Sequence, residues 1–165
     1  MKTLWTPWRM EYVCGKGESE AGCLFEQAMH KKHDRASLML YRDGRGSIFM
    51  NRFPYANGHL LIAPSRHVGD LADLNDEELL HLMRLTKNSL AILRRQLRPD
   101  GFNVGLNLGK SAGAGIAEHL HYHVVPRWQG DHNFMTVLAA VRTIPEHIDA
   151  TFERLRPFFG ALGDS

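Results

Sequence analysis

The chain has 165 residues, of which 44% are hydrophobic and 23% charged, a composition that is typical of a globular domain and excludes a disordered or fibrous protein. Its 20 basic and 18 acidic residues leave a net charge of +2, which lacks the basic excess of a dedicated nucleic-acid-binding protein. Two cysteines are too few for a disulfide framework, apolar runs such as Val137–Val141 are far shorter than the ~20 residues of a membrane span, and no secretory signal is apparent. We therefore expect a cytoplasmic protein whose partners include neither nucleic acid nor a membrane.

The first half of the chain predicts an irregular arm, a short helix and a strand–turn–strand unit. Residues 1–25 are rich in aromatic residues and glycine and are expected to form the arm, and a short helix is predicted over 24–33. The apolar segments Ser47–Asn51 and His59–Ala63 are predicted strands, because a proline and an Asn-Gly pair, both typical of turns, lie between them.

The clearest predicted helix runs from Asp76 to about Leu97. Asn75 precedes it as a capping residue, and Glu78 stands where the second half of a capping box belongs. Leucines recur at helical spacing along this segment, so one face of the helix is expected to be buried.

The second half of the chain adds two predicted strands and a closing helix. Residues 102–108 and 119–125 are the strands, and Pro126 is expected to end the second. The closing helix follows a capping signature at 143–146 and carries an apolar stripe from Ile148 to Phe159. Clustered strands with two inserted helices predict a single α+β domain over residues 1–165, with a mainly antiparallel sheet, one long helix and a C-terminal helix.

The most informative segment contains His119, His121 and His123. Side chains alternate along a strand, so all three imidazoles are expected on one face. Three interpretations compete: a solvated polar face of an edge strand, a zinc site built from these histidines, and catalysis in which one imidazole attacks while its neighbours donate protons or charge. The small-residue loop Gly109–Gly115 precedes the histidines, and its backbone N–H groups are suited to approach an anion, which favours catalysis at a phosphate.

The run His119–Val125 reads His-φ-His-φ-His-φ-φ, where φ is apolar, and resembles the signature of the histidine-triad nucleotide-binding proteins. Residues 51–62 are similar to the upstream strand and turn of that family. The segments 5–10 and 125–134 resemble its prokaryotic branch, near the diadenosine tetraphosphate phosphorylases and dinucleoside polyphosphate hydrolases.

This resemblance implies a role for each histidine. His121 is expected to be the nucleophile on the α-phosphorus and to form a nucleotidyl-histidine, with its other ring nitrogen held by a backbone carbonyl. His123 is expected to contact the phosphate, and His59 and His119 are expected to form a supporting hydrogen-bonded pair. The catalytic candidates are thus His121, His119, His123 and His59.

The resemblance also implies a nucleotide site. Phe49 is expected to pack on the base, Asn51 to hold the ribose hydroxyls, and Asn107 to orient the α-phosphate. With the loop as a phosphate cradle, the candidate nucleotide-binding residues are Phe49, Asn51, Asn107, Gly113, Ala114 and Gly115. A homodimer is expected for the same reason.

Two departures from the family pattern bear on the reaction and on metal binding. Gly115, Ile116 and Ala117 stand where the family often has Gln, Ser or Thr, so the acceptor of the second half-reaction, water or phosphate, stays open. Many relatives carry Cys-x-x-Cys as a structural zinc site, whereas this chain has Cys23 and Glu26 at these positions. We therefore expect no required cofactor and no structural zinc, although a divalent cation accompanying a polyphosphate substrate is compatible with this interpretation.

The expected function is cleavage of dinucleoside polyphosphates of the diadenosine tetraphosphate type through a nucleotidyl-histidine. Hydrolysis of adenosine phosphoramidates is an alternative within the same chemistry. A non-catalytic nucleotide-binding module is an alternative from a different class, as is a metalloprotein in which the three histidines of the triad bind zinc. Of the other histidines, His67 is a candidate phosphate contact, and His30, His33, His81, His132 and His147 are expected at the surface.

Overall fold

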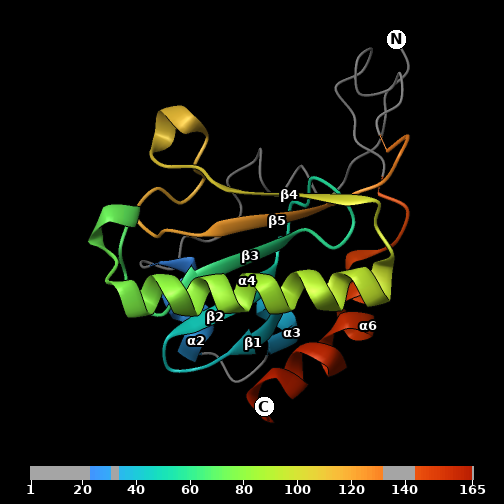
Figure 1. Cartoon of the computed structure of the whole chain (residues 1–165), viewed down its shortest axis with the longest axis horizontal. Coiled ribbons are helices and arrows are strands. Elements are labelled where there is room, and N and C mark those ends of the chain that lie inside the picture. The colour runs from blue at the N-terminus through green and yellow to red at the C-terminus, as the bar shows by residue number, and fades with distance from the viewer. Residues whose placement is uncertain (1–22, 31–33, 132–143, 165) are drawn as a thin grey trace.

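The computed structural model describes residues 23–30, 34–131 and 144–164. A five-stranded sheet with the order β1-β2-β3-β5-β4 forms its centre, and every neighbouring pair of strands is antiparallel (Figure 1). The strands are β1 (Met39–Arg42), β2 (Gly46–Met50), β3 (Leu60–Pro64), β4 (Gly101–Leu106) and β5 (Tyr122–Arg127). The predicted α+β class with an antiparallel sheet is confirmed.

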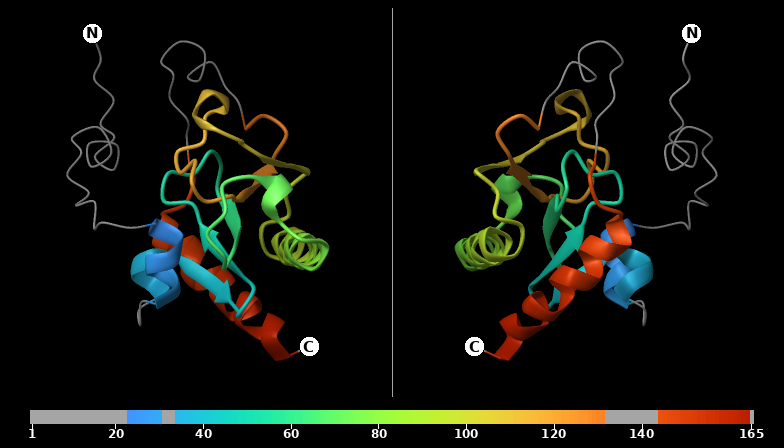
Figure 2. Two further views of the ribbon diagram at one scale, coloured as in Figure 1. Left: turned by 90° about the vertical axis from the view of Figure 1, so that its left-hand side faces the viewer. Right: turned by 90° about the vertical axis from the view of Figure 1, so that its right-hand side faces the viewer.

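Helices cover both faces of this sheet. The helices are α2 (Leu24–His30), α3 (Asp34–Ser37), α4 (Asp76–Leu97) and α6 (Ile148–Gly160), and the short 3-10 turns are η1 (Leu71–Asp73), η2 (Lys110–Ala112) and η3 (Ala161–Asp164). The long helix α4 lies along one face, and α2 and α3 lie on the opposite side (Figure 2). Over the described parts of the chain, no helix combines the length and apolar character that crossing a bilayer requires.

Alternation along the strands divides the buried side chains between the two faces. On the α4 face, Ile48, Ile62 and Val124 are fully buried in the main core, which α4 and the apolar stripe of α6 complete. On the opposite face, Phe49 packs with Phe25 of α2 in a smaller cluster. His123 is paired with Leu61, a residue that packs against this smaller cluster, so the histidine segment lies on the face away from α4.

Local sequence signals explain α4 and the β2–β3 turn. The side chain of Asn75 accepts a hydrogen bond from the N–H of Glu78 at 2.9 Å, and the Glu78 carboxylate accepts from the N–H of Asn75 at 3.0 Å, which confirms the predicted capping box. Gly58 has a φ of +72°, and a Cβ there would overlap the side chain of Leu97, so the turn requires glycine. This turn closes the β2–β3 hairpin and brings His59 beside Asn51.

The structure corrects several predicted elements. The strand β1 was not predicted, because its four residues are too few to show an alternating pattern. The strand predicted over residues 119–125 begins only at Tyr122, as β5, and continues through Pro126, which was expected to end it. The strand tolerates this proline because β5 pairs with β3 only over Tyr122–Val124, so beyond Val124 that side of β5 needs no N–H donor. Helix α6 is capped by His147 rather than by the predicted signature, whose Thr143 lies outside the described residues.

The N-terminal predictions are tested only in part. Most of the predicted arm lies outside the described residues, and α2 already begins at Leu24. The helix predicted over 24–33 ends at His30 in the structure, and a separate turn of helix, α3, begins at Asp34.

Candidate active site

The tautomer of His121 is set by a hydrogen bond to the backbone. Its Nδ1 lies 2.9 Å from the carbonyl oxygen of His119. A carbonyl oxygen can only accept, so Nδ1 carries the hydrogen and Nε2 keeps its lone pair. The side chain is buried, and this burial lowers the pKa of His121, which favours the neutral form. His121 is therefore a neutral imidazole whose Nε2 can act as a nucleophile.

A chain of hydrogen bonds sets the tautomer of His123 in the same way. The backbone N–H of Tyr55 donates to Nδ1 of His59 at 3.1 Å, so Nδ1 is an acceptor and the hydrogen of the His59 ring is on Nε2. This Nε2 lies 2.9 Å from Nδ1 of His123 and donates to it. His123 consequently carries its own hydrogen on Nε2.

The Nε2–H group of His123 is a buried donor with no hydrogen-bond partner among the described residues. Burial, and secondly the neighbouring His121, lower the pKa of His123 to about 4, so this ring is neutral near pH 7. The two rings lie 4.9 Å apart between centroids. A buried donor left unpaired costs free energy, and its position beside the ring of His121 suits an acceptor oxygen of a ligand.

The prediction that His59 and His119 form a hydrogen-bonded pair is wrong. His119 donates from Nε2 to the carbonyl oxygen of Pro64 at 2.9 Å, and its Nδ1 lies 3.1 Å from Sγ of Cys23. The reason is the antiparallel register of β3 and β5. His59 precedes β3 and lies near His123, whereas His119 precedes β5 and lies near the far end of β3.

His119 belongs instead to a group of side chains that could hold a metal ion. The ligand atoms of Cys23, His67 and His119 all lie within 4.8 Å of one another, and the carboxylate of Glu26 lies 3.4 Å from Nδ1 of His67. Because His119 donates from Nε2, its Nδ1 offers a lone pair toward Cys23. A cysteine sulfur, two imidazoles and a carboxylate form a donor set that suits zinc.

The sequence did not predict that His67 lies with Cys23 and His119. It was predicted as a candidate phosphate contact, and the structure places it next to His119, with ring centroids 5.2 Å apart. Only the Cys-x-x-Glu spacing signalled a metal site, since His67 and His119 meet through tertiary structure.

The zinc site built from the three triad histidines is contradicted. In the described residues, the rings of His119, His121 and His123 do not converge, because Nδ1 of His121 bonds to a carbonyl and the ring of His119 is directed to Cys23 and Pro64.

The prediction that His81 lies at the surface is also wrong. It is buried rather than at the surface, with Nε2 3.0 Å from the carboxylate of Asp43.

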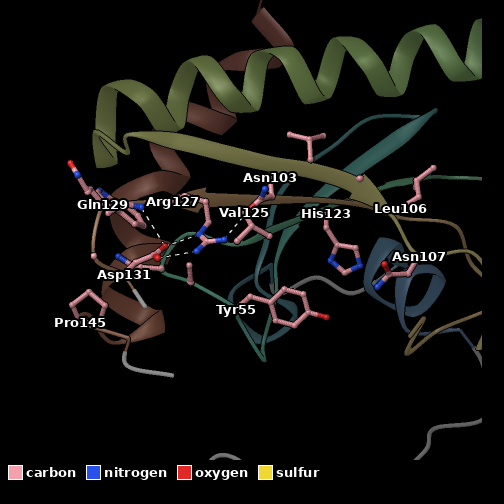
Figure 3. Close-up of a pocket in the computed structure, with 16 residues that line it drawn as sticks. Tyr55, Asn103, Leu106, Asn107, His123, Val125, Arg127, Gln129, Asp131 and Pro145 are labelled. Atoms are coloured by element: carbon pink, nitrogen blue, oxygen red, sulfur yellow. Dashed lines mark hydrogen bonds and ion pairs between the residues drawn. The ribbon is translucent and has the colours of Figure 1, made fainter. Parts of the chain in front are cut away.

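The three predicted nucleotide contacts outside the loop lie in different surroundings. Phe49 is 4% exposed and packs edge-on against Phe25, so it offers no open face to a base in this structure. Asn51 accepts from the N–H of Phe53 at 2.9 Å and approaches Nδ1 of His59 through its amide nitrogen, and thus supports the turn. Asn107 lies at the end of β4 beside His123, as Figure 3 shows.

The predicted phosphate cradle is only partly available. The N–H of Gly113 donates to the carbonyl of Lys110 at 3.0 Å, and that of Ala114 donates to the carbonyl of Gly109 at 3.3 Å. Both groups are bonded inside the loop in this structure and are therefore not presented to an anion. Gly115 follows them as an exposed residue.

His123 also lies at one end of a groove of about 800 Å³ (Figure 3). The groove follows β4 and β5 on the face away from α4, with Tyr55 on one side and the turn Trp128–Asp131 at its far end. The structure thus brings His59, His121 and His123 together, and of these three His123 lines the groove. The ring of His119 lies instead with Cys23 and His67, a group that we call the thiol–imidazole cluster.

The lowered pKa of His123 predicts acid-sensitive folding. The unfolded imidazole binds a proton near pH 6.5, whereas the folded one binds it only near pH 4. The stabilisation is therefore complete above pH 6.5 and is lost as the pH falls toward 4. We expect urea titrations to show a free energy of unfolding that decreases over this window, and a smaller decrease for His123→Gln.

His147→Asn is the control for this experiment, because His147 is exposed and Asn keeps its capping function. It should show the wild-type pH dependence. A free energy of unfolding that stays constant between pH 6.5 and 4 in the wild-type protein contradicts the assignment.

Comparisons with known proteins identify the family of the chain. The HIT domain family matches residues 32–130. The AP-4-A phosphorylase of Mycobacterium tuberculosis is 40% identical over 154 residues, covering 88% of this chain and 78% of that protein. The asymmetrical bis(5'-nucleosyl)-tetraphosphatase of Schizosaccharomyces pombe is 29% identical over 106 residues, covering 64% and 58% of the two chains.

A solved structure is similar to most of the chain. The chain is similar to a Zn-bound histidine triad family protein from Mycobacterium smegmatis, with 27% identity, a TM-score of 0.61, and coverage of 77% of this chain and 86% of that one. The family match spans more than half of the sequence and contains the histidine segment. The chain therefore belongs to the HIT domain family.

Proposed function

We propose that this protein cleaves dinucleoside polyphosphates of the diadenosine tetraphosphate type by transferring a nucleotidyl group to His121. The observation that carries the proposal is the hydrogen bond from Nδ1 of His121 to the carbonyl of His119, which leaves the Nε2 lone pair for attack. The mycobacterial phosphorylase and the fission-yeast tetraphosphatase support the substrate class.

The first half-reaction uses the two neutral imidazoles differently. Nε2 of His121 forms a bond to the α-phosphorus, and the bond from that phosphorus to the bridging oxygen breaks, with the electron pair leaving on the departing nucleotide. The Nε2–H of His123 is positioned to donate to an oxygen of the reacting phosphate. Such a fixed donor stabilises charge as it develops without any reorientation of solvent.

The second half-reaction returns His121 to its starting state. Water or inorganic phosphate attacks the phosphorus of the nucleotidyl-histidine, and the P–N bond breaks with its electron pair returning to Nε2. The two relatives act with different acceptors by name, a phosphorylase in one case and a hydrolase in the other, so their similarity supports both outcomes.

We further propose a zinc ion bound by Cys23, His67 and His119, with Glu26 as the fourth ligand, in place of the expectation that this chain lacks zinc. The clustering of these donors and the similarity to a Zn-bound relative support it. Bound zinc would join α2, the loop after β3 and the start of the histidine segment. It would thereby fix the backbone of His119, whose carbonyl orients His121.

The expected homodimer remains a proposal. The strand β4 supports it, because β4 lies at the edge of the sheet and none of its residues is buried. An edge of this kind is suited to pair with a second copy.

Replacing the nucleophile tests the mechanism. His121→Ala should reduce kcat on diadenosine tetraphosphate by about 10⁴-fold or more, which is typical for the loss of a catalytic nucleophile. Nucleotide affinity should persist, and a nucleotidyl adduct that mass spectrometry detects in the wild-type protein should be absent. Near-normal turnover by the variant contradicts the assignment of His121.

Product analysis distinguishes the acceptors. Incubation with diadenosine tetraphosphate should give AMP and ATP if water is the acceptor, and ADP and ATP in the presence of phosphate if phosphate is the acceptor. Turnover of adenosine phosphoramidate alone would instead favour the phosphoramidase alternative. Tight nucleotide binding without any product or adduct would favour a binding module and contradict the proposal.

Metal analysis tests the zinc site independently of activity. Protein from zinc-supplemented cultures should contain about one zinc per chain, and Cys23→Ala and His67→Ala should lose it. At a hundredfold excess over its Kd, zinc should stabilise the wild-type fold by ~2.7 kcal/mol. His147→Asn, which alters a histidine outside the cluster, should retain the metal. Zinc-free wild-type protein, or zinc retained by Cys23→Ala, contradicts the site.

A further inference from the structure

The neutral rings of His59 and His123 can change tautomer only together. Nε2 of His59 lies 2.9 Å from Nδ1 of His123, and one of these two nitrogens must donate to the other. If Nδ1 of His123 were the donor, its Nε2 would carry a lone pair, which would repel an oxygen of a phosphate instead of binding it. Whether His123 offers a donor at Nε2 therefore depends on which nitrogen of His59 carries the hydrogen.

The backbone N–H of Tyr55 decides between the two arrangements. It donates to Nδ1 of His59 at 3.1 Å, and a backbone N–H cannot accept. A hydrogen on Nδ1 of His59 would face this N–H and is excluded while the β2–β3 turn keeps its shape. The amide nitrogen of Asn51 lies 3.3 Å from the same Nδ1, but an amide side chain can turn over and present its oxygen instead. The position of Tyr55 in the turn thus selects the tautomer.

Polar side chains join this turn to the start of α6. Asn57, two residues after Tyr55, donates from Nδ2 to the carboxylate of Glu146 at 3.3 Å. The hydroxyl of Thr151 lies 2.9 Å from Oδ1 of Asn57 and 2.6 Å from the carboxylate of Glu146, to which Arg154 also donates. We call Asn57, Glu146 and Thr151 the turn–α6 link. It holds together two segments that are about 90 residues apart in the chain.

The hydroxyl of Thr151 is directed to this link rather than to its own helix. Buried hydroxyls in helices commonly donate to the carbonyl four residues earlier, as those of Thr86 and Ser89 in α4 do at 2.8 Å. Thr151 is fully buried, but its hydroxyl lies 3.5 Å from the corresponding carbonyl of His147. Its shortest contact is the one with Glu146. The hydroxyl therefore stabilises the junction between α6 and the turn.

We infer that the turn–α6 link fixes the tautomers of His59 and His123, because it holds the N–H of Tyr55 against Nδ1 of His59. The positioning residues are Asn57, Glu146 and Thr151. For its effect on catalysis, the inference rests on the proposed nucleotidyl transfer, in which the Nε2–H of His123 donates to the reacting phosphate. The tautomers themselves belong to the free protein and can be measured whether or not the reaction occurs.

Thr151→Val tests this inference, because valine has the shape of threonine without the hydroxyl. Heteronuclear NMR of the imidazole nitrogens distinguishes those that carry a hydrogen from those that do not. In the wild-type protein, His59 and His123 should both carry it on Nε2. In Thr151→Val, and equally in Asn57→Ala, the Nδ1–H tautomers of both rings should appear, whereas His121 should keep its hydrogen on Nδ1.

Turnover should follow the spectra. The Nε2–H of His123 stabilises charge that develops during the reaction, so its partial loss should lower kcat for diadenosine tetraphosphate by about 10-fold and change KM by less than about twofold. Thr151→Ser restores the hydroxyl and should restore the wild-type spectrum and kcat. The double variant Asn57→Ala/Thr151→Val should lose no more than the more affected single variant, since both substitutions break the same link.

Thr86→Val is the matched control, because it removes another buried threonine hydroxyl, which donates to the carbonyl of Leu82 within α4. It should show the wild-type tautomers and kcat. Wild-type tautomers of His59 and His123 in Asn57→Ala would overturn the inference even if Thr151→Val does not fold, as would altered tautomers in Thr86→Val. A wild-type protein without turnover would contradict the proposed function, and the spectra would still decide this inference.

Discussion

The hydrogen bond from Nδ1 of His121 to the carbonyl of His119 is the interaction on which the chemistry of this site depends. It fixes the tautomer of a buried imidazole and leaves one nitrogen with a lone pair. Without it, the ring could carry its hydrogen on either nitrogen. In one of these two tautomers, Nε2 would present a hydrogen rather than a lone pair to phosphorus. The carbonyl that fixes this tautomer belongs to His119, whose side chain lies in the thiol–imidazole cluster.

The antiparallel register of β3 and β5 distributes the histidines between two tasks. Residues early in the histidine segment lie near the end of β3, and those later in the segment lie near its start. His119 consequently meets Pro64 and the cluster containing Cys23, whereas His123 meets His59. The triad is thus a short segment that connects the thiol–imidazole cluster to the pair formed by His59 and His123, rather than three equivalent side chains on one open face.

The sequence predicts what depends on local chemistry and periodicity, and fails where tertiary structure decides. The capping box at Asn75 and the hairpin around Gly58 are local, and the structure contains both. The catalytic candidates were identified from a motif, but the partners of His59 and His119 depend on strand register, which their spacing does not specify. His81 and His67 show the same limit, because Asp43 and the residues around Cys23 reach them from distant parts of the chain.

Burial of the three triad imidazoles determines what kind of phosphate site this is. Burial lowers the pKa of all three, so near pH 7 they act as neutral donors and lone pairs and not as cations. A neutral site of this kind can stabilise charge that develops at one phosphorus, but it does not neutralise the charge of a long polyphosphate. Solvent, or a cation that accompanies the substrate, would have to compensate that charge.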